Sequence, residues 1–319
     1  MSTFSTGTTR KFSGTWPGGG VLVTVDATIQ SPRVIARALT DLARKRFVAD
    51  RIFSRGSADQ VAGGAALFQR SESIYMDRDP EPVGIGARFP RASWSELLFA
   101  AVVKKYGLEF PVYDESIRRN QIDVIQRGQR KIANSLVKFV DSVAMALFYA
   151  DANVLTAAAS GDWSTAATDI IFDIATARAL IDNQDEGYEA DTLLVHGNQE
   201  LDLIVDKDIR DALPREGGGS SAVISGSPVP ILGLRQIIKS NQVTAGKPIL
   251  LSSGIVGTIA DEAPLARESY VAYNPGAGQA NIWVKVYNND DIDATIVRGA
   301  RFPAMWIAEP KAAFVWTGA

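Results

Sequence analysis

The chain has 319 residues, of which 46% are hydrophobic and 22% are charged, a balance typical of folded globular proteins. This composition excludes a wholly disordered chain, and the length predicts two domains or one large one. The sequence holds no cysteine and one histidine, His196, which excludes disulfides and multi-histidine metal centres, and the net charge of −3 argues against a globally basic nucleic-acid binder. We expect no secretory signal and no membrane span, because no apolar run reaches the roughly 18 residues that a span requires.

Charge is unevenly distributed along the chain. The first 58 residues are strongly basic, whereas the stretch 182–216 is strongly acidic. This division predicts two surfaces with different partners, and solvated surfaces of opposite charge explain it equally well.

The first 58 residues are expected to form an extended arm followed by a short helix. Residues 1–30 predict the arm, and Ser31 with Pro32 forms a typical helix start. Apolar residues at helical spacing then predict a helix that ends near Asp50, with a buried stripe made of Val34, Ile35, Leu39 and Leu42.

The segment 57–94 has an irregular pattern. Two runs, 66–76 and 83–90, favour extended structure on either side of the turn-rich sequence DRDPEP. Neither run has a clean apolar face, and an isolated two-stranded hairpin is marginal in water. We therefore expect either a loop or a hairpin that another molecule stabilises.

The longest helical pattern covers residues 114–149. Asp114 is a suitable N-cap, and no proline interrupts the following segment. At 1.5 Å per residue, a helix of this length spans roughly 50 Å. Its apolar face is expected to contain Ile125, Ile132, Leu136, Phe139, Val140, Val143 and Leu147, and its opposite face is basic, with Arg118, Arg119, Arg127, Arg130, Lys131 and Lys138.

Residues 164–264 are predicted to form a mixed α/β unit. Ser164 is expected to cap a helix, and residues 198–213 to form a second helix with Leu201, Ile204 and Val205 inward. The loop 214–230 is flexible by composition. Strands are expected at 192–195, 231–238, 249–252 and 255–259.

The last part of the chain, 266–319, is predicted to be mostly strands. A turn at the sequence NNDD separates the first two of them. The strands are expected at 282–287, 294–301, 304–307 and 312–316.

Motifs that carry chemistry are incomplete. No full phosphate-binding or dinucleotide-binding motif is present, and the acidic clusters at 202–208 and 288–293 favour a solvated helix face and a turn over cation sites. His196 follows a predicted buried strand, a position that catalytic groups often occupy, with Asp191 and Glu200 nearby in sequence. A structural role for the lone histidine is the stronger interpretation. We expect no enzyme activity, no cofactor and no metal.

The order of the parts is more informative than any motif. It resembles the major capsid protein of tailed bacteriophages, with the Hong Kong 97-type (HK97-like) fold, an α+β fold. The resemblance is carried by GARFPRASW at 86–94, by the long helical segment at 113–147, and by two further stretches at 189–213 and 291–318.

The resemblance implies a division of the chain into named parts. Residues 1–58 would be the N-terminal arm with its short helix, and 59–95 the extended β-hairpin loop (E-loop). Residues 96–163 and 265–305 would form the peripheral domain, with the spine helix at 114–149. Residues 164–264 and 306–319 would form the axial domain.

It also implies residues for contacts. Inter-subunit contacts of the E-loop would come from Phe68, Arg70, Tyr75, Asp77, Arg78, Asp79, Arg88 and Arg91. The loop at the axial pore would contribute Arg215, Glu216, Gly217, Gly218 and Gly219. The surface of the spine helix would present Arg118, Arg119, Arg127 and Arg130, and the basic arm at the inner face Arg10, Lys11, Arg33 and Arg37.

The function implied is self-assembly, as pentamers and hexamers, into an icosahedral shell in the host cytoplasm, with the virion capsid as the final location. The implied partners are copies of the chain, a portal, packaged double-stranded DNA held non-specifically, and a separate scaffold protein, because the arm starts close to Met1. Residues 57–103 contain no lysine, so a covalent weld from this loop is not expected. Non-covalent contacts or a decoration protein would stabilise the shell.

Three alternatives stay open at this point. The first is an encapsulin-like nanocompartment shell, which would enclose protein cargo. The second is a soluble α/β enzyme that uses His196. The third is a tail or baseplate adaptor, which would form small rings.

Overall fold

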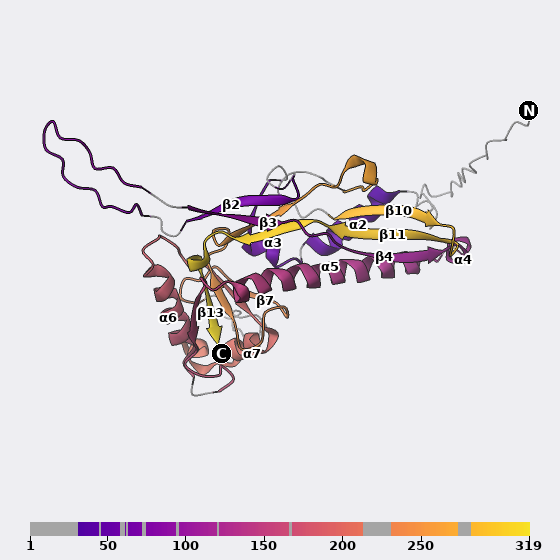
Figure 1. The fold of residues 1–319 in the computed structure, drawn as a ribbon. Coiled ribbons are helices and arrows are strands. Elements are labelled where there is room, and N and C mark those ends of the chain that lie inside the picture. Colours follow the sequence, from indigo (N-terminus) through magenta and orange to yellow (C-terminus); the bar gives the residue numbers. More distant parts are fainter. Residues whose placement is uncertain are drawn as a thin grey trace, which may run out of the picture.

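The computed structural model describes residues 31–44, 46–57, 61, 63–71, 75–93, 96–119, 121–165, 168–212, 231–273 and 282–319. It has a long layer of helices and strands, an α/β lobe at one end of that layer, and a long narrow loop that projects from the body (Figure 1). The arm predicted at 1–30 and the loop predicted at 214–230 lie outside the described residues.

The long layer combines a spine helix with a three-stranded antiparallel sheet. The sheet has the order β10 (Trp283–Asn289), β11 (Ala294–Arg301), β4 (Tyr106–Tyr113), and α5 (Ile122–Ala150) runs along it (Figure 1). With 29 residues, α5 is about 44 Å long. Asn289 pairs with Ala294 across the turn, which confirms the hairpin predicted at NNDD.

The spine is interrupted near its start, contrary to the prediction of one helix from residue 114. A short helix, α4 (Asp114–Arg118), comes first, and Gln121 then occupies the N-cap position of α5. Asp114 is therefore the first helical residue and not the cap. Along α5, Gly128 permits close packing on the sheet, because a Cβ atom at this position would lie 2.4 Å from the ring of Phe110 on β4.

The apolar face of α5 is narrower than predicted. Ile125, Ile132, Leu136 and Val140 are buried, but Phe139 is half-exposed, because the buried stripe shifts around the helix along its length. Among the described residues, α5 is the one helix that is long and apolar enough to cross a membrane. The expectation that no segment would meet this criterion is therefore wrong. The core helix of a soluble protein passes the same test, and α5 packs against α2, β4, β11, β12 and β13.

The N-terminal helix is shorter than predicted. Helix α2 (Pro32–Arg44) ends before Asp50, and a separate turn, α3 (Ala49–Ile52), follows. Ile35 and Leu39 are buried as expected, whereas Val34 and Leu42 are exposed. Helix α2 packs against α5 and β10, and its buried face includes Ala36 and Ala43 in place of Val34 and Leu42.

The α/β lobe is built on a five-stranded mixed sheet. Its order is β5 (Leu155–Ala158), β13 (Ala313–Thr317), β8 (Ile249–Leu251), β6 (Thr192–Val195) and β7 (Gln236–Lys239). The β5–β13 and β6–β7 pairs are parallel, and β8 is antiparallel to both of its neighbours. The helices of the lobe are α6 (Ile170–Asp182), α7 (Gly197–Val205) and α8 (Lys207–Ala212).

Several local expectations in the lobe were wrong. Asp169, and not Ser164, caps α6, because its carboxylate accepts the N–H of Phe172 at 2.9 Å. On α7, Leu203 is buried, whereas Leu201 and Val205 are exposed. The helix predicted at 198–213 is divided in two after Val205.

The strand predicted at 255–259 belongs to a different sheet. Strand β9 (Gly257–Asp261) lies between β1 (Ser54–Arg55) and β12 (Pro303–Ile307) and joins the N-terminal segment to the C-terminal part of the chain. The described residues also include two short 3-10 helices, Ala266–Glu268 and Pro310–Ala312.

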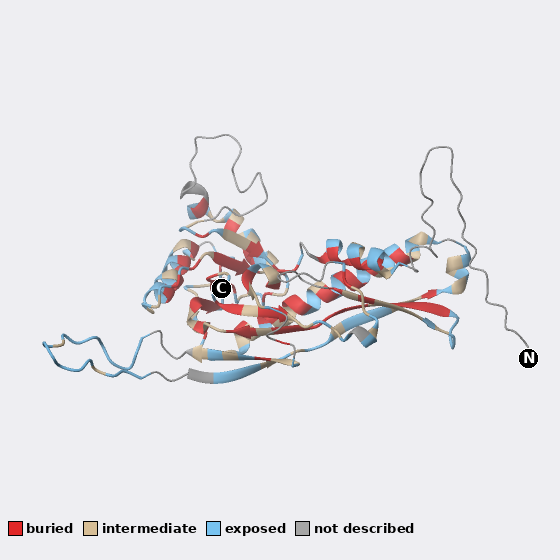
Figure 2. Ribbon diagram, turned by 90° about the horizontal axis from the view of Figure 1, so that it is seen from above, coloured by how far each residue is buried: buried red, intermediate tan, exposed pale blue. Residues whose placement is uncertain are grey.

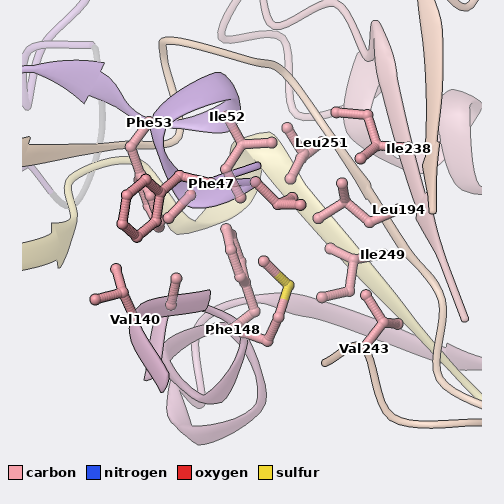
Figure 3. Close-up of a cluster of buried hydrophobic side chains, with 14 of the residues drawn as sticks. Phe47, Ile52, Phe53, Val140, Phe148, Leu194, Ile238, Val243, Ile249 and Leu251 are labelled. Carbon is pink, nitrogen blue, oxygen red and sulfur yellow. The ribbon is translucent and has the colours of Figure 1, made fainter. Parts of the chain in front are cut away.

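One continuous hydrophobic core runs through the long layer and the lobe. At their junction, Phe47 and Ile52 meet Phe148 of α5 and strand residues of the lobe (Figure 3). The rings of Phe53 and Phe148 stack with centroids 5.6 Å apart. Such continuous burial joins the two parts into one folded unit.

A two-stranded sheet of β2 (Ala65–Ser71) and β3 (Glu96–Val102), here called the ribbon, lies along the body and leads into the projecting loop (Figure 1). The first predicted run, 66–76, is confirmed as a strand only as far as Ser71, because Tyr75 and Met76 lie in the loop. Residues 83–90 form no strand, and the partner of β2 lies further along the chain. Residues 75–93 form a long loop that projects beyond the ribbon and is exposed along most of its length (Figure 2).

Candidate intersubunit surfaces

The base of the ribbon is anchored to the body by aromatic contacts. The ring of Phe68 stacks on Trp306 of β12 at 5.5 Å and on Phe99 of β3 at 5.8 Å. Around Trp306, a small cluster of buried residues forms a satellite core made of Val61, Ala66, Ala260 and Ala304. Arg70 adds an ion pair of 2.7 Å with Asp151, at the end of the spine helix. These contacts fix the root of the ribbon.

The opposite face of the ribbon is apolar and exposed. In the antiparallel register Leu67 faces Ala100, and Gln69 faces Leu98. Leu67, Leu98 and Val102 are all more than 60% exposed. A two-stranded sheet with an open apolar face and free edges is unstable alone and tends to pair with another chain.

The loop is pinched at its neck. The Asp77 carboxylate accepts hydrogen bonds from the backbone N–H of Ser93 at 2.8 Å and from its hydroxyl at 2.7 Å. These hydrogen bonds lower the pKa of Asp77. Beyond the neck, Ile85 and Phe89 are almost completely exposed, with Gly86 in the left-handed region at φ 81°. The tip therefore presents apolar side chains that the described part of the chain does not bury.

The remaining residues predicted for the E-loop lie on or near this loop. Tyr75 donates a hydrogen bond to the carbonyl of Asp185, and Arg78 pairs with Glu81 at 2.9 Å. Asp79, Arg88 and Arg91 are exposed. Phe68 and Arg70 have partners within the chain, as described above. That these residues contact a neighbouring subunit stays a prediction.

The residues predicted for the spine surface are all exposed. Arg118 and Arg119 lie at the end of α4, and Arg127 and Arg130 lie on α5. On α2, Arg33 and Arg37 are exposed, and Arg37 lies 3.7 Å from Asp41. The other residues predicted for the arm and the axial pore lie outside the described residues, namely Arg10, Lys11, Arg215, Glu216, Gly217, Gly218 and Gly219.

A buried ion cluster, which the sequence did not predict, ties strands β1, β9 and β11 together. The Arg301 side chain is fully buried and donates to Asp261 at 2.9 and 3.0 Å and to Asp50 at 2.8 and 3.2 Å. Arg55 also pairs with both carboxylates, at 2.7 Å for Asp261. Burial alone would lower the pKa of Arg301, but the two carboxylates outweigh it and raise that pKa.

This cluster joins segments that are far apart in the chain. Asp50 lies on α3, Arg55 on β1, Asp261 on β9 and Arg301 on β11. The guanidinium of Arg301 also lies over the ring of Phe47, 4.5 Å from its centroid. Removing one member of such a buried set leaves an uncompensated charge, so the cluster holds the N-terminal segment firmly on the sheet.

A second buried carboxylate, Asp141, lies on the apolar face of α5. Its Oδ1 accepts the N–H groups of Val48 and Ala49 at 3.0 Å each and so fixes the start of α3. Burial raises the pKa of Asp141 to about 6, although these hydrogen bonds lower it. The sequence held a signal for this role, because Asp141 interrupts an otherwise apolar helical stripe.

His196 serves as a helix cap. Its Nδ1 accepts the N–H of Asn198 at 3.3 Å, and the Gln199 side chain accepts the N–H of His196, which completes a capping box. The two carboxylates considered as catalytic partners make other contacts. Asp191 binds Ser253, and Glu200 pairs with Lys239. Among the described residues, no group of three or more acidic or histidine side chains is placed to hold a metal ion.

Comparisons with known proteins agree on the fold. The chain resembles a structure from Mycobacterium phage Che8 with a TM-score of 0.59 and 12% identity, covering 85% of this chain and 90% of that one. The capsid of cyanophage P-SCSP1u gives a TM-score of 0.59 and 12% identity, covering 85% and 86%. A virus-like particle from Pyrococcus furiosus gives a TM-score of 0.58 and 14% identity, covering 88% and 97%. No curated protein matches the chain in sequence.

The expected HK97-like fold is confirmed by these structural matches together with the mixed helix and sheet architecture. Fold similarity at this level of identity shows the architecture alone. The family is shown by the sequence: the family model of the phage capsid protein matches residues 98–316, from β3 to β13. The chain therefore belongs to the phage capsid protein family.

Proposed function

We propose that this major capsid protein assembles as pentamers and hexamers into the closed icosahedral shell of a tailed phage and encloses double-stranded DNA. The observation that carries the proposal is the ribbon with its loop, residues 65–102. It has an apolar face and an apolar tip that are exposed, and no other strand among the described residues pairs with its edges. A neighbouring copy would bury these groups.

The parts of the subunit have separate roles in this proposal. The E-loop would lie over a neighbour, the axial domain at 164–264 and 306–319 would meet its copies around the symmetry axes, and the remaining body would form the peripheral domain. Strand β5 would be added to the axial domain, because it pairs with β13 in the same sheet. The arm would run at the inner face, and a scaffold, a portal and a decoration protein would be further partners of the shell.

A second candidate is a shell that encloses protein and not DNA. The similarity to the virus-like particle from Pyrococcus furiosus favours it, since that match is as good as those to phage structures. The match to the phage capsid family model favours DNA. Analysis of the contents of nuclease-treated particles distinguishes the two, because a phage shell should protect DNA.

The direct test is excision of the loop at its neck. Residues 78–92 are replaced by two glycines, because the backbone N–H of Asp77 already lies 3.3 Å from the carbonyl of Ser93 and a tight turn can join them. The ribbon strands and the body stay intact in this variant. We expect a folded subunit with the circular dichroism spectrum and melting behaviour of the wild type, but no closed particles by electron microscopy.

A matched control keeps the loop and changes only charge. Substituting Lys104 and Lys207 by glutamine alters two exposed side chains outside the loop, and this control is expected to assemble normally. Closed particles of normal size from the excised variant would contradict the proposed role of the loop.

A further inference from the structure

The exposed face of α5 carries a row of cations. Arg127, Arg130, Lys131 and Lys138 recur at intervals that place them on one face of the helix, together with Asn134, and all of them are exposed. From the first to the last, this row extends about 16 Å along the helix axis.

The row continues onto the segment that follows α2. Arg46 donates a hydrogen bond to Asn134, which places its guanidinium beside the cations of α5. The exposed carboxylate of Asp123, one turn before Arg127, is the acidic residue at the start of the row. We call Arg46, Arg127, Arg130, Lys131 and Lys138 the spine cation row.

These five cations lie together on one surface, and none of them has an acidic partner among the described residues. In contrast, Arg70, Lys239 and Arg298 are each paired. An unpaired row of like charges repels itself and is stabilised when a polyanion lies on it.

We propose that the spine cation row is a binding surface for the phosphate backbone of double-stranded DNA, so that this side of α5 faces the enclosed genome. The inference rests on the proposed function, in which the shell encloses DNA. It assigns the contact to a specific helix face inside the folded body. The composition of the whole chain, with a net charge of −3, does not reveal this face.

The chemistry of the row favours a phosphate backbone over base recognition. Its five members are all cations, and it includes no aromatic side chain on which a base could stack. Lysine and arginine spread along one helix face contact phosphates without reading sequence. The competing occupant is an acidic peptide segment, such as the stretch 182–216 of another copy, and the experiment below separates the two.

The test measures binding of the full-length, dissociated subunit to a mixed-sequence 20-base-pair DNA duplex over a range of salt concentrations. The variant Lys131→Gln/Lys138→Gln removes two members of the row, and Lys104→Gln/Lys207→Gln removes the same charge elsewhere. Each phosphate contact contributes roughly 0.9 to the slope of log K against log salt. We expect the row variant to have a slope shallower by about 1.8 and the control variant to keep the wild-type slope.

Equal slopes for the two variants would overturn the inference. In a competition assay, a peptide of residues 182–216 is added to the bound duplex. If the peptide displaces the duplex equally from the wild type and from the row variant, the inference is also overturned. A second measurement does not depend on substitution. In DNA-filled particles, acylation of Lys131 and Lys138 by a small amine reagent should be slow and should accelerate after the DNA is released, while Lys104 is unchanged. Equal rates before and after release would also overturn it. Failure of the wild type to form particles at all would refute the proposed function instead.

Discussion

Substituting Arg301 by methionine tests the claim that the buried ion cluster holds the N-terminal segment on the sheet. Methionine has a similar length and is apolar, so it fills the space without supplying charge or donors. The change leaves Asp50 and Asp261, whose side chains are 11% and 5% exposed, without their main cation. Four hydrogen bonds from the guanidinium are lost at the same time.

The cost can be bounded from the structure. Removing one partner of a buried ion pair generally costs about 3–5 kcal/mol, because the remaining charge stays desolvated. Arg55 still pairs with both carboxylates in the variant, so we expect the lower end, about 3 kcal/mol. This is a large part of the roughly 5–15 kcal/mol by which a typical protein is stable.

Urea unfolding of the dissociated subunit, followed by circular dichroism, measures this cost. The matched control is Arg298→Met, three positions earlier on the same strand, where the side chain is 33% exposed and pairs with Glu109. We expect a cost of about 1 kcal/mol or less for that exposed pair. If the two variants lose the same stability, or if Arg301→Met loses less than about 1 kcal/mol, the argument from buried charge is refuted.

Three further predictions concern other parts of the subunit. Asp141→Asn removes a carboxyl whose pKa in the folded state, about 6, lies above its usual value of 3.8. As pH rises from 4 to 7, the free energy of unfolding of the wild type should therefore fall by on the order of 3 kcal/mol relative to that of the variant. Urea unfolding at each pH measures this difference. Gly257→Ala should destabilise by about 1–3 kcal/mol, because the new Cβ atom would lie 2.3 Å from a backbone carbonyl oxygen, whereas Gly63→Ala has open space and should be neutral. The double variant Ile85→Ser/Phe89→Ser should keep the melting temperature of the subunit but reduce particle yield several-fold by light scattering.

Each prediction has an outcome that contradicts it. The stability of the wild type should fall with rising pH, because the folded state binds the proton of Asp141 more tightly than the unfolded state does between pH 4 and 6. A wild type that becomes more stable than the variant as pH rises over this range would refute the raised pKa of Asp141. Equal melting of the two glycine variants would contradict the packing at Gly257. Normal particle yield from the serine double variant would show that the tip is not buried on assembly.

The sequence predicted the strands of the C-terminal part well because their signal is local. The run at 282–287 alternates in side-chain character, and a turn-forming sequence separates it from the next strand, so both strands and their hairpin could be inferred. The capsid-like order of parts added the global arrangement. Helix existence was also predictable, but helix boundaries were not, since Asp141 and a break before α5 decide where α3 and α5 begin.

What the sequence could not predict depends on contacts between distant segments. Asp50, Asp261 and Arg301 meet only in the folded chain, and no local pattern marks them as a set. The ribbon shows the same limit, because β2 pairs with β3 across a long loop and not with the nearer extended run at 83–90. The outward turn of Leu201 and Val205 on α7 depends on which helix face the neighbouring strands cover.

We propose that another copy of the chain covers the exposed ribbon and its loop. Electron microscopy of the purified full-length protein, with the loop-excised variant prepared in parallel, tests it most directly. We expect closed particles from the wild type and folded, dispersed subunits from the variant. A wild type that stays a single compact molecule with its loop folded onto its own body would contradict it.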